Sequence, residues 1–273
     1  MYRIYNLKSS DNVEVSAELG PFTVITHLRN LAPNLENRPG AMMESYYAGL
    51  LMDRKRQLIC QLNQSAVLVA AGMMQWMAGE CKMVSDANGL FGYLGKQIRG
   101  KTTGQSCIAP KYSGSGTLVL EPVDEDIMLV NLQDWQEGIV IEKGLFLACS
   151  ADVQQSTVMR SNVSSTALGN EGLFSMALKG QGFAALRVPC PKETLVLIEL
   201  EDDVLKVDGN FAIAWSSSLE FTVENSGKTM VSTALSGEGF VNTFRGTGKI
   251  LLAPYLSFGT KEVEKSTDNP SNS

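Results

Sequence analysis

The chain has 273 residues, 44% of them hydrophobic and 19% charged, and its net charge is −6 at pH 7. This apolar share provides a sizeable core and excludes a wholly disordered protein, while the length suits one large β domain or two ordinary ones. The acidic balance removes the attraction to phosphates that non-specific binding of DNA or RNA depends on, so nucleic-acid binding is not expected.

Cysteine usage and hydropathy indicate where the chain works. Its five cysteines lie far apart with no C-x-x-C pair; they are Cys60, Cys81, Cys107, Cys149 and Cys190. The odd number and the lack of a signal peptide indicate a reducing compartment. No stretch reaches about 18 consecutive apolar residues, so no transmembrane segment is predicted. We therefore expect a cytoplasmic protein.

The first 55 residues lack the pattern that organises the rest of the chain. Short strands are predicted at Tyr2–Leu7 and Val13–Leu19, separated by the turn-forming residues Lys8–Asn12. Leu31–Met43 is rich in Asn and Pro and is predicted to be a loop. Residues 1–55 are thus expected to form an N-terminal arm or an added hairpin.

A glycine phrase recurs through the remainder of the chain. It begins at Gly114, Gly180 and Gly246, at intervals of 66 residues. Each copy has the form Gly-x-Gly followed by a short apolar run and a proline, which is typical of a turn that leads into a strand. The six glycines of these phrases are predicted to be structural turns; they are Gly114, Gly116, Gly180, Gly182, Gly246 and Gly248. A fixed interval of this kind indicates repeated supersecondary units.

A strand, a turn and a second strand precede each phrase. The predicted strand pairs are Leu58–Leu62 with Ala66–Ala71, Ile139–Ile141 with Leu145–Ser150, and Leu205–Val207 with Phe211–Ser216. About a dozen additional residues are expected within Ser85–Tyr112. Because strands this short cannot bury both faces alone, the units must share one core. The prediction is an all-β domain at residues 56–258 with three tandem β repeats, about 56–113, 114–179 and 180–258, in a sandwich or barrel. Residues 259–273 are predicted to be a disordered tail.

Two segments resemble a known family. Gly237–Pro254 is similar to the closing signature of the "altered inheritance of mitochondria" family, and Leu68–Gly79 resembles its opening signature. The similarity covers about residues 56–258, and the segment before Arg56 has no counterpart. The resemblance implies a fold like that of the tryptophan RNA-binding attenuation protein, with three β units in a sandwich or double-stranded β-helix. It also implies self-association, for example as a trimer, and no assigned catalysis.

Three features were weighed as catalytic or ligand sites. The only histidine, His27, lies on a predicted strand, and no Cys/His cluster accompanies it as a metal site would require. The acidic triplets Asp124–Asp126 and Glu201–Asp203 suit a cation site, but they equally suit turns that keep sheet edges solvated. The Gly-x-Gly phrases open predicted strands, whereas phosphate loops open helices. No catalytic residue, cofactor or metal is therefore predicted.

One apolar segment remains as a candidate contact site. Met73, Met74, Trp76 and Met77 form an adaptable patch that fills a core when buried and recognises partners when exposed. Trp135 and Trp215 are predicted to be core residues.

Two function classes follow from these features. The first is a non-enzymatic assembly or scaffold protein, expected to be a homo-oligomer. The alternative is a small-ligand or RNA-binding module, which rests on analogy of fold alone.

Overall fold

The chain is built of β-strands. The computed structural model describes residues 2–29, 43, 54–84, 109–142, 144–159, 174–208, 210–225 and 240–255, and these form fifteen strands and two short 3-10 helices. The two antiparallel sheets confirm the predicted all-β class. The predicted tail and Cys107, together with most of the predicted loop and insertion, lie outside the described residues.

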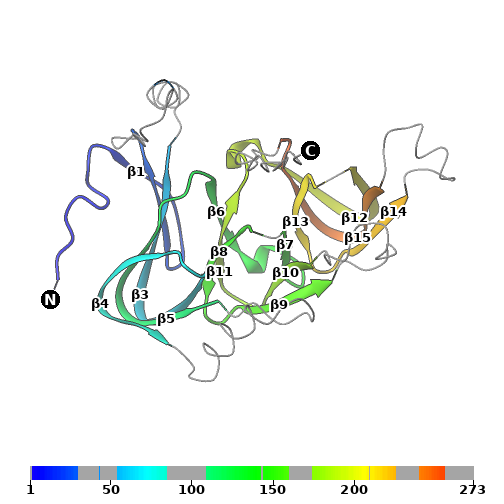
Figure 1. Ribbon diagram of the computed structural model, residues 1–273. Helices are drawn as coiled ribbons and strands as arrows, with labels where there is room; N and C mark the ends of the chain where they lie inside the picture. Colours follow the sequence, from blue (N-terminus) through cyan, green and yellow to red (C-terminus); the bar gives the residue numbers. More distant parts are fainter. Residues whose placement is uncertain are drawn as a thin grey trace, which may run out of the picture.

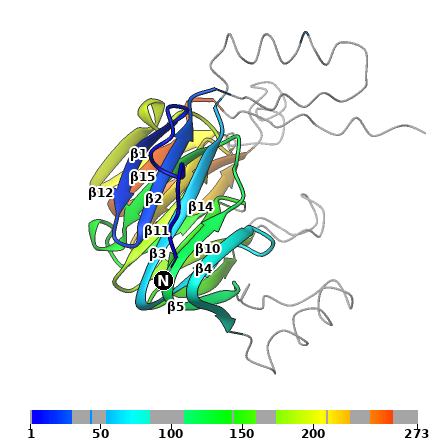
Figure 2. The ribbon, with the colours of Figure 1, turned by 90° about the vertical axis from the view of Figure 1, so that its left-hand side faces the viewer.

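The first sheet has eight strands. Its order is β1-β2-β3-β8-β11-β6, with β5 paired to both β3 and β4. The strands are β1 (Val13–Leu19), β2 (Phe22–His27), β3 (Arg56–Val69), β4 (Met74–Val84), β5 (Lys111–Leu120), β6 (Asp126–Asn131), β8 (Phe146–Ser150) and β11 (Phe183–Val188). Figure 2 shows β1, β2 and β3 side by side on one outer face of the molecule.

The second sheet has seven strands. Its order is β12-β15-β13-β7-β10-β9, with β14 paired to β15. The strands are β7 (Ile139–Ile141), β9 (Gln154–Met159), β10 (Phe174–Lys179), β12 (Val196–Asp208), β13 (Ala212–Ser216), β14 (Glu220–Asn225) and β15 (Phe240–Leu252). The 3-10 helices are η1 (Leu132–Asp134) and η2 (Lys192–Thr194). In Figure 1, β3–β5 lie at one end of the molecule, β12–β15 at the other, and β6–β11 between them.

The glycine phrases lie differently from the prediction. Gly114 and Gly116 fall inside β5, and Gly246 and Gly248 fall inside β15, so these four are not at turns between strands. A Cβ atom on Gly114 would lie 1.9 Å from the carbonyl oxygen of Glu80 on β4. Glycine is thus required where a paired strand bends and the neighbouring backbone comes very close.

Each of these bends faces a bulge in the neighbouring strand. The register between β3 and β5 shifts between Leu62 and Ser65, where a turn was expected, and Gln64 there has a φ of 47°. The register between β12 and β15 shifts between Leu200 and Asp203, where Asp202 has a φ of 51°. A bulge inserts an extra residue without ending the strand, so β3 and β12 continue past it.

The middle phrase connects the two sheets. Gly180 and Gly182 lie between β10 in the second sheet and β11 in the first. Each glycine-phrase strand is flanked on both sides: β5 by β3 and β4, β11 by β6 and β8, β10 by β7 and β9, and β15 by β12 on one side and β13 and β14 on the other. The division of residues 56–258 into three units stays a prediction, and its first boundary would cut β5.

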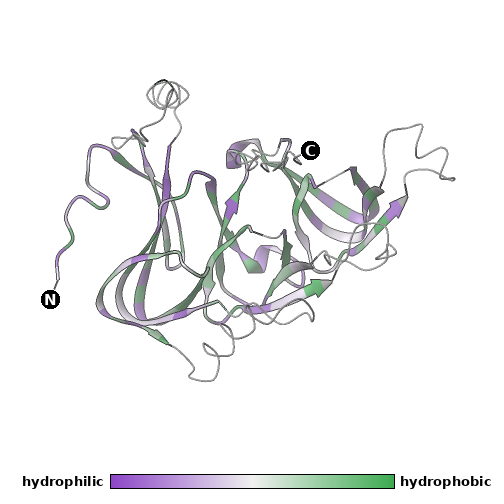
Figure 3. Cartoon of the chain, in the orientation of Figure 1, coloured by the Kyte–Doolittle hydropathy of each residue, from purple (hydrophilic) through white to green (hydrophobic). Residues whose placement is uncertain are grey.

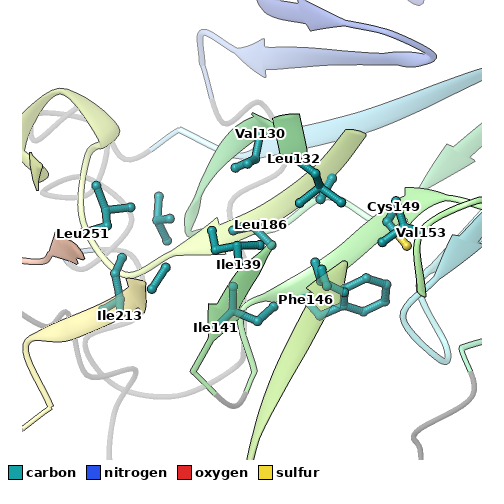
Figure 4. Close-up of a cluster of buried hydrophobic side chains, with 14 of the residues drawn as sticks. Val130, Leu132, Ile139, Ile141, Phe146, Cys149, Val153, Leu186, Ile213 and Leu251 are labelled. Atoms are coloured by element: carbon teal, nitrogen blue, oxygen red, sulfur yellow. The ribbon is translucent and has the colours of Figure 1, made fainter. Parts of the chain in front are cut away.

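Alternating apolar side chains fill three buried clusters (Figure 3). The first-sheet core includes Phe22, Leu58, Val67, Leu118 and Ala148, and the second-sheet core includes Val140, Leu205, Trp215, Phe221 and Phe244. The central core joins the sheets; Figure 4 shows side chains from both meeting there, among them Ile139, Ile141, Phe146, Leu186, Ile213 and Leu251. Trp135 is half-buried against this central core, and Trp215 is 3% exposed, so both predicted core tryptophans pack inward.

The N-terminal segment packs against the first sheet. β1 and β2 form an antiparallel hairpin, and β2 pairs with β3. The strand predicted at Tyr2–Leu7 is absent, since this segment is irregular and Asn6 has a φ of 65°, which interrupts an extended run. Leu7 joins an outer-face cluster on the first sheet, which also contains Val13, Ile25, Ile59, Trp76 and Val119.

Candidate interaction surface

Exposed apolar side chains occur in numbers on two strands, β4 and β12. They are Met74 (37% exposed), Met77 (39%) and Met83 (44%) on β4, and Val196 (47%), Leu197 (50%) and Val204 (42%) on β12. Neighbouring apolar side chains held at a surface are typical of contact sites for other macromolecules. These two strands are therefore the first candidates for a binding surface.

The fold divides the predicted apolar patch. Met74 and Met77 are exposed, whereas Met73 is half-buried against the first-sheet core. Trp76 is half-buried in the outer-face cluster. The segment is thus part core and part surface, because successive side chains of a strand point to opposite faces.

Both candidate strands are sheet edges. Among the described residues β4 pairs only with β5, and β12 pairs only with β15. The outer sides of both strands therefore carry backbone N–H and C=O groups without a strand partner, and such edges are templates for pairing with another chain. The two edges lie at opposite ends of the molecule (Figure 1).

A junction inside the first sheet shows how such edges can be joined. The second half of β3 pairs with β8, and the opposed residues are Val67 and Ser150, Leu68 and Cys149, and Val69 and Ala148. Two backbone hydrogen bonds flank these pairs. Ala70 donates to the carbonyl oxygen of Leu147 over 2.8 Å, and Ala151 donates to that of Ala66 over 3.1 Å.

A second junction repeats the first in the other sheet. Here β7 pairs with β13, and the opposed residues are Ile139 and Ser216, Val140 and Trp215, and Ile141 and Ala214. Glu142 donates to the carbonyl oxygen of Ile213 over 3.0 Å, and Ser217 donates to that of Gly138 over 2.9 Å. The number of opposed pairs and the order of the flanking bonds are the same at both junctions.

The only histidine takes part in a chain of side-chain amides. His27 Nε2 lies 3.2 Å from Gln57 Oε1, and the buried Gln57 donates from Nε2 to Gln75 Oε1 and to the carbonyl oxygen of Leu120, each over 2.8 Å. Because the Gln57 amide nitrogen has two acceptors, its oxygen faces the histidine, which donates from Nε2. This arrangement ties β2, β3 and β5 together and gives His27 a structural role.

The acidic triplets are not brought together as a cation site. Asp126 is buried and accepts from the backbone N–H groups of Ile127 and Lys192 over 2.8 and 3.0 Å, which anchors η2 to β6. Glu201–Asp203 lies at the β12 bulge, within a strand rather than at a turn, and all three residues are exposed. In the described ranges no group of three or more His, Cys, Asp or Glu side chains could hold a metal ion.

A cluster of charges lies beside the β12 edge. Glu224 on β14 accepts from Lys206 on β12 over 3.0 Å and also accepts from Arg245 on β15. These hydrogen bonds, first that of Lys206 and then that of Arg245, lower the pKa of Glu224 to about 2. The cluster fixes the Lys206 side chain next to the exposed edge.

Comparison with known proteins places this fold in a family. The family model described as mitochondrial biogenesis AIM24 matches residues 50–255. The chain belongs to the AIM24 family. This confirms the family resemblance, and the match includes both signature segments.

Two streptococcal proteins are similar to this AIM24 chain. An uncharacterised protein of Streptococcus pyogenes serotype M6 is 26% identical over 194 residues, which cover 68% of this chain and 76% of the relative. A crystal structure of a protein from Streptococcus pyogenes matches with a TM-score of 0.54 at 24% identity, covering 74% of this chain and 89% of that chain. The structural match concerns the fold alone.

The edges differ in how well the sequence revealed them. The β4 segment was found as an apolar patch, whereas the β12 edge, Val204–Asp208, was missed as a contact site. The available signal was the interval of 66 residues, which sets Leu205–Val207 where Ile139–Ile141 lies one phrase earlier. No helix among the described residues is long and apolar enough to cross a membrane.

Proposed function

We propose that this AIM24-family chain acts without catalysis, as a self-associating assembly or interaction protein. The observation that carries the proposal is that two edge strands at opposite ends of the molecule, β4 and β12, display exposed apolar side chains. An unpaired apolar edge is avoided in proteins that work alone, because it invites edge-to-edge association. Two such edges at opposite ends suit a protein that joins other copies.

The alternative, a small-ligand or RNA-binding module, requires converging polar groups in a concave site or a basic stripe with aromatic residues. The polar clusters described above bind within the chain instead. His27, Gln57 and Gln75 bind one another, and Lys206 and Arg245 are neutralised by Glu224. The geometry therefore favours assembly.

A reducing, cytoplasmic location is part of the same proposal. Cys60, Cys81, Cys149 and Cys190 are free thiols, and Cys60, Cys149 and Cys190 are buried. Free thiols are typical of proteins kept in a reducing compartment.

Light scattering coupled to size-exclusion chromatography of the full chain tests the proposal. The chain mass is 29.6 kDa, and we expect a multiple of this mass at micromolar concentration. A constant mass of 29.6 kDa across the micromolar range would refute self-association.

A further inference from the structure

We infer that copies of the chain join by antiparallel pairing of the β12 edge of one copy, Val204–Asp208, with the β4 edge of the next, Met74–Gly79. The inference rests on the proposed self-association and specifies its geometry. The same junction is already made twice inside the chain, by β3 with β8 and by β7 with β13. A third junction of this kind has both of its edges present and neither of them filled.

Pairing within the sheets shows which β12 residues correspond to those in β3 and β7. Three residues spaced 66 apart on the glycine-phrase strands each mark one position. They are Tyr112, Leu178 and Phe244, and they pair with Val67, Ile139 and Leu205 respectively. Val67 and Ile139 each begin an internal junction, so Leu205 is the corresponding residue of the unfilled one.

The other flank of the same strands identifies the β4 residues. Leu118, Ala184 and Ile250, again 66 apart, pair with Met77, Cys149 and Trp215 respectively. A register shift of one residue precedes each of these positions, between Met74 and Trp76 on β4 and between Ala212 and Ala214 on β13, and opposite Ala185 and Leu186 on β8. Cys149 and Trp215 are the central residues of the internal junctions, so Met77 is the central residue of the β4 edge.

The register of the unfilled junction follows from these correspondences. Opposed residues would be Leu205 and Ala78, Lys206 and Met77, and Val207 and Trp76 of the next copy. The flanking bonds would run from Asp208 N–H to the carbonyl oxygen of Gln75 and from Gly79 N–H to that of Val204. Because ladder bonds recur every second residue, the central pair is a hydrogen-bonded one whose N–H groups face outward in the isolated chain.

The partner must be another copy rather than the same chain. The β4 and β12 edges lie at opposite ends of the molecule in Figure 1, so one chain cannot bring them together without unfolding. The exposed side chains of Met77 and Val204 would be covered in the pairing. The aliphatic part of Lys206 can lie along Met77 while its ammonium group stays with Glu224.

Such pairing is head-to-tail, because the two surfaces that meet are different. Each copy therefore keeps one β4 edge and one β12 edge free for further copies, and the assembly ends only when a ring closes. The other unpaired edges, among them β9 and β14, lack a precedent inside the chain for the partner they would take.

Engineered disulfide cross-linking of the full chain tests this register. The double variant Lys206→Cys with Met77→Cys places thiols in a pair whose Cα atoms are about 5.5 Å apart, within the range of a disulfide. Lys206→Cys with Met83→Cys is the matched control, since Met83 is exposed on the same strand but about 20 Å further along it. Both are oxidised mildly beside the wild type and run without reductant, and their masses are measured under reducing conditions.

The inference predicts a ladder beyond the dimer for the Met77 variant, well above that of the Met83 control and the wild type. If both variants and the wild type form multimers but the Met77 variant gives no excess ladder, this register is wrong and self-association stands. If all three are monomers, both proposals fail.

Discussion

The backbone N–H of Gln64 donates to Ser115 Oγ over 3.1 Å, across the bulge of β3 and the glycine phrase of β5. The same bond recurs at β12 and β15, where Asp202 N–H donates to Thr247 Oγ1 over 3.0 Å. Both donors have left-handed backbones, which a side-chain acceptor helps to hold. The hydroxyl between the two glycines of the phrase therefore stabilises the bulge opposite.

Replacing this hydroxyl should lower stability. We expect Ser115→Ala to reduce the free energy of unfolding by about 0.5–1 kcal/mol, because one exposed hydrogen bond is lost. Urea denaturation measures the change, and Ser156→Ala at an exposed position of β9 is the control, expected within about 0.5 kcal/mol of the wild type. Equal effects at both positions would show that the Ser115 bond contributes nothing.

The close approach of β4 at Gly114 gives a sharper prediction. In Gly114→Ala the new Cβ would meet the Glu80 carbonyl oxygen at 1.9 Å, at a φ of 132°. Backbone cannot move aside cheaply, so we expect a loss of about 3 kcal/mol or more. Gly72→Ala is the control, since its φ is 80° but no atom lies within 4 Å, and about 1–2 kcal/mol is expected. Thermal unfolding of the two variants should rank them in this order.

The aromatic cluster of the second-sheet core predicts a large truncation effect. Phe244 is fully buried, and its ring centroid lies 5.3 Å from that of Trp215 and 5.2 Å from that of Phe221. We expect Phe244→Ala to cost about 3–5 kcal/mol, through lost contacts and the cavity left behind. Tyr255→Ala, at a 49% exposed position, should stay within about 0.5 kcal/mol of the wild type. Chemical denaturation of both variants would contradict this if their midpoints shifted equally.

Acid should weaken the contribution of Glu224. Its pKa falls from 4.5 to about 2 in the folded protein, because Lys206 and Arg245 donate to the carboxylate. A carboxyl with a lowered pKa stabilises the fold above its unfolded pKa and loses this effect as pH falls through the folded value. We expect the stability difference between the wild type and Glu224→Gln to be constant above about pH 5 and to shrink between pH 4.5 and 2. A difference independent of pH in urea titrations would contradict the assignment.

The thiols should differ in reactivity. Burial raises the pKa of Cys60, and it raises that of Cys149 to about 12 although Gln155 donates to the Cys149 sulfur. Cys81 is half-buried, and burial raises the pKa of its thiol as well. Since thiolates react and access is required, iodoacetamide should label Cys81 first and the other two only on unfolding. Peptide mass spectrometry at pH 8 reads the order, and early labelling of Cys60 would contradict the packing of β3.

Much of the fold could be predicted because strand content and spacing are local properties. The strands at Val13–Leu19 and Ile139–Ile141 were predicted with their observed bounds, and the all-β class followed from short apolar runs. Turns were over-predicted because glycine and bulge residues carry the same composition whether a strand ends or only bends. The Asn63–Ser65 segment shows this, since β3 continues through it.

The candidate site was predicted in part for a different reason. Met74 and Met77 stand out as an apolar run, but their exposure depends on β4 being a sheet edge, which is a property of the whole topology. The β12 edge contains Lys206 and Asp208 and has no apolar run to mark it. Its relation to β4 emerges only from the pairings of β3 with β8 and β7 with β13.

Amide hydrogen exchange of the full chain, resolved by residue at micromolar concentration, tests the central claim most directly. If copies pair through β12 and β4, the outward amides of Met77, Gly79, Lys206 and Asp208 are protected to the level of amides inside the sheets. The outer amides of β14, an edge with no proposed partner, exchange rapidly and serve as the internal reference. Exchange of the four amides as fast as that reference, in a sample at assembly concentration, would contradict the account.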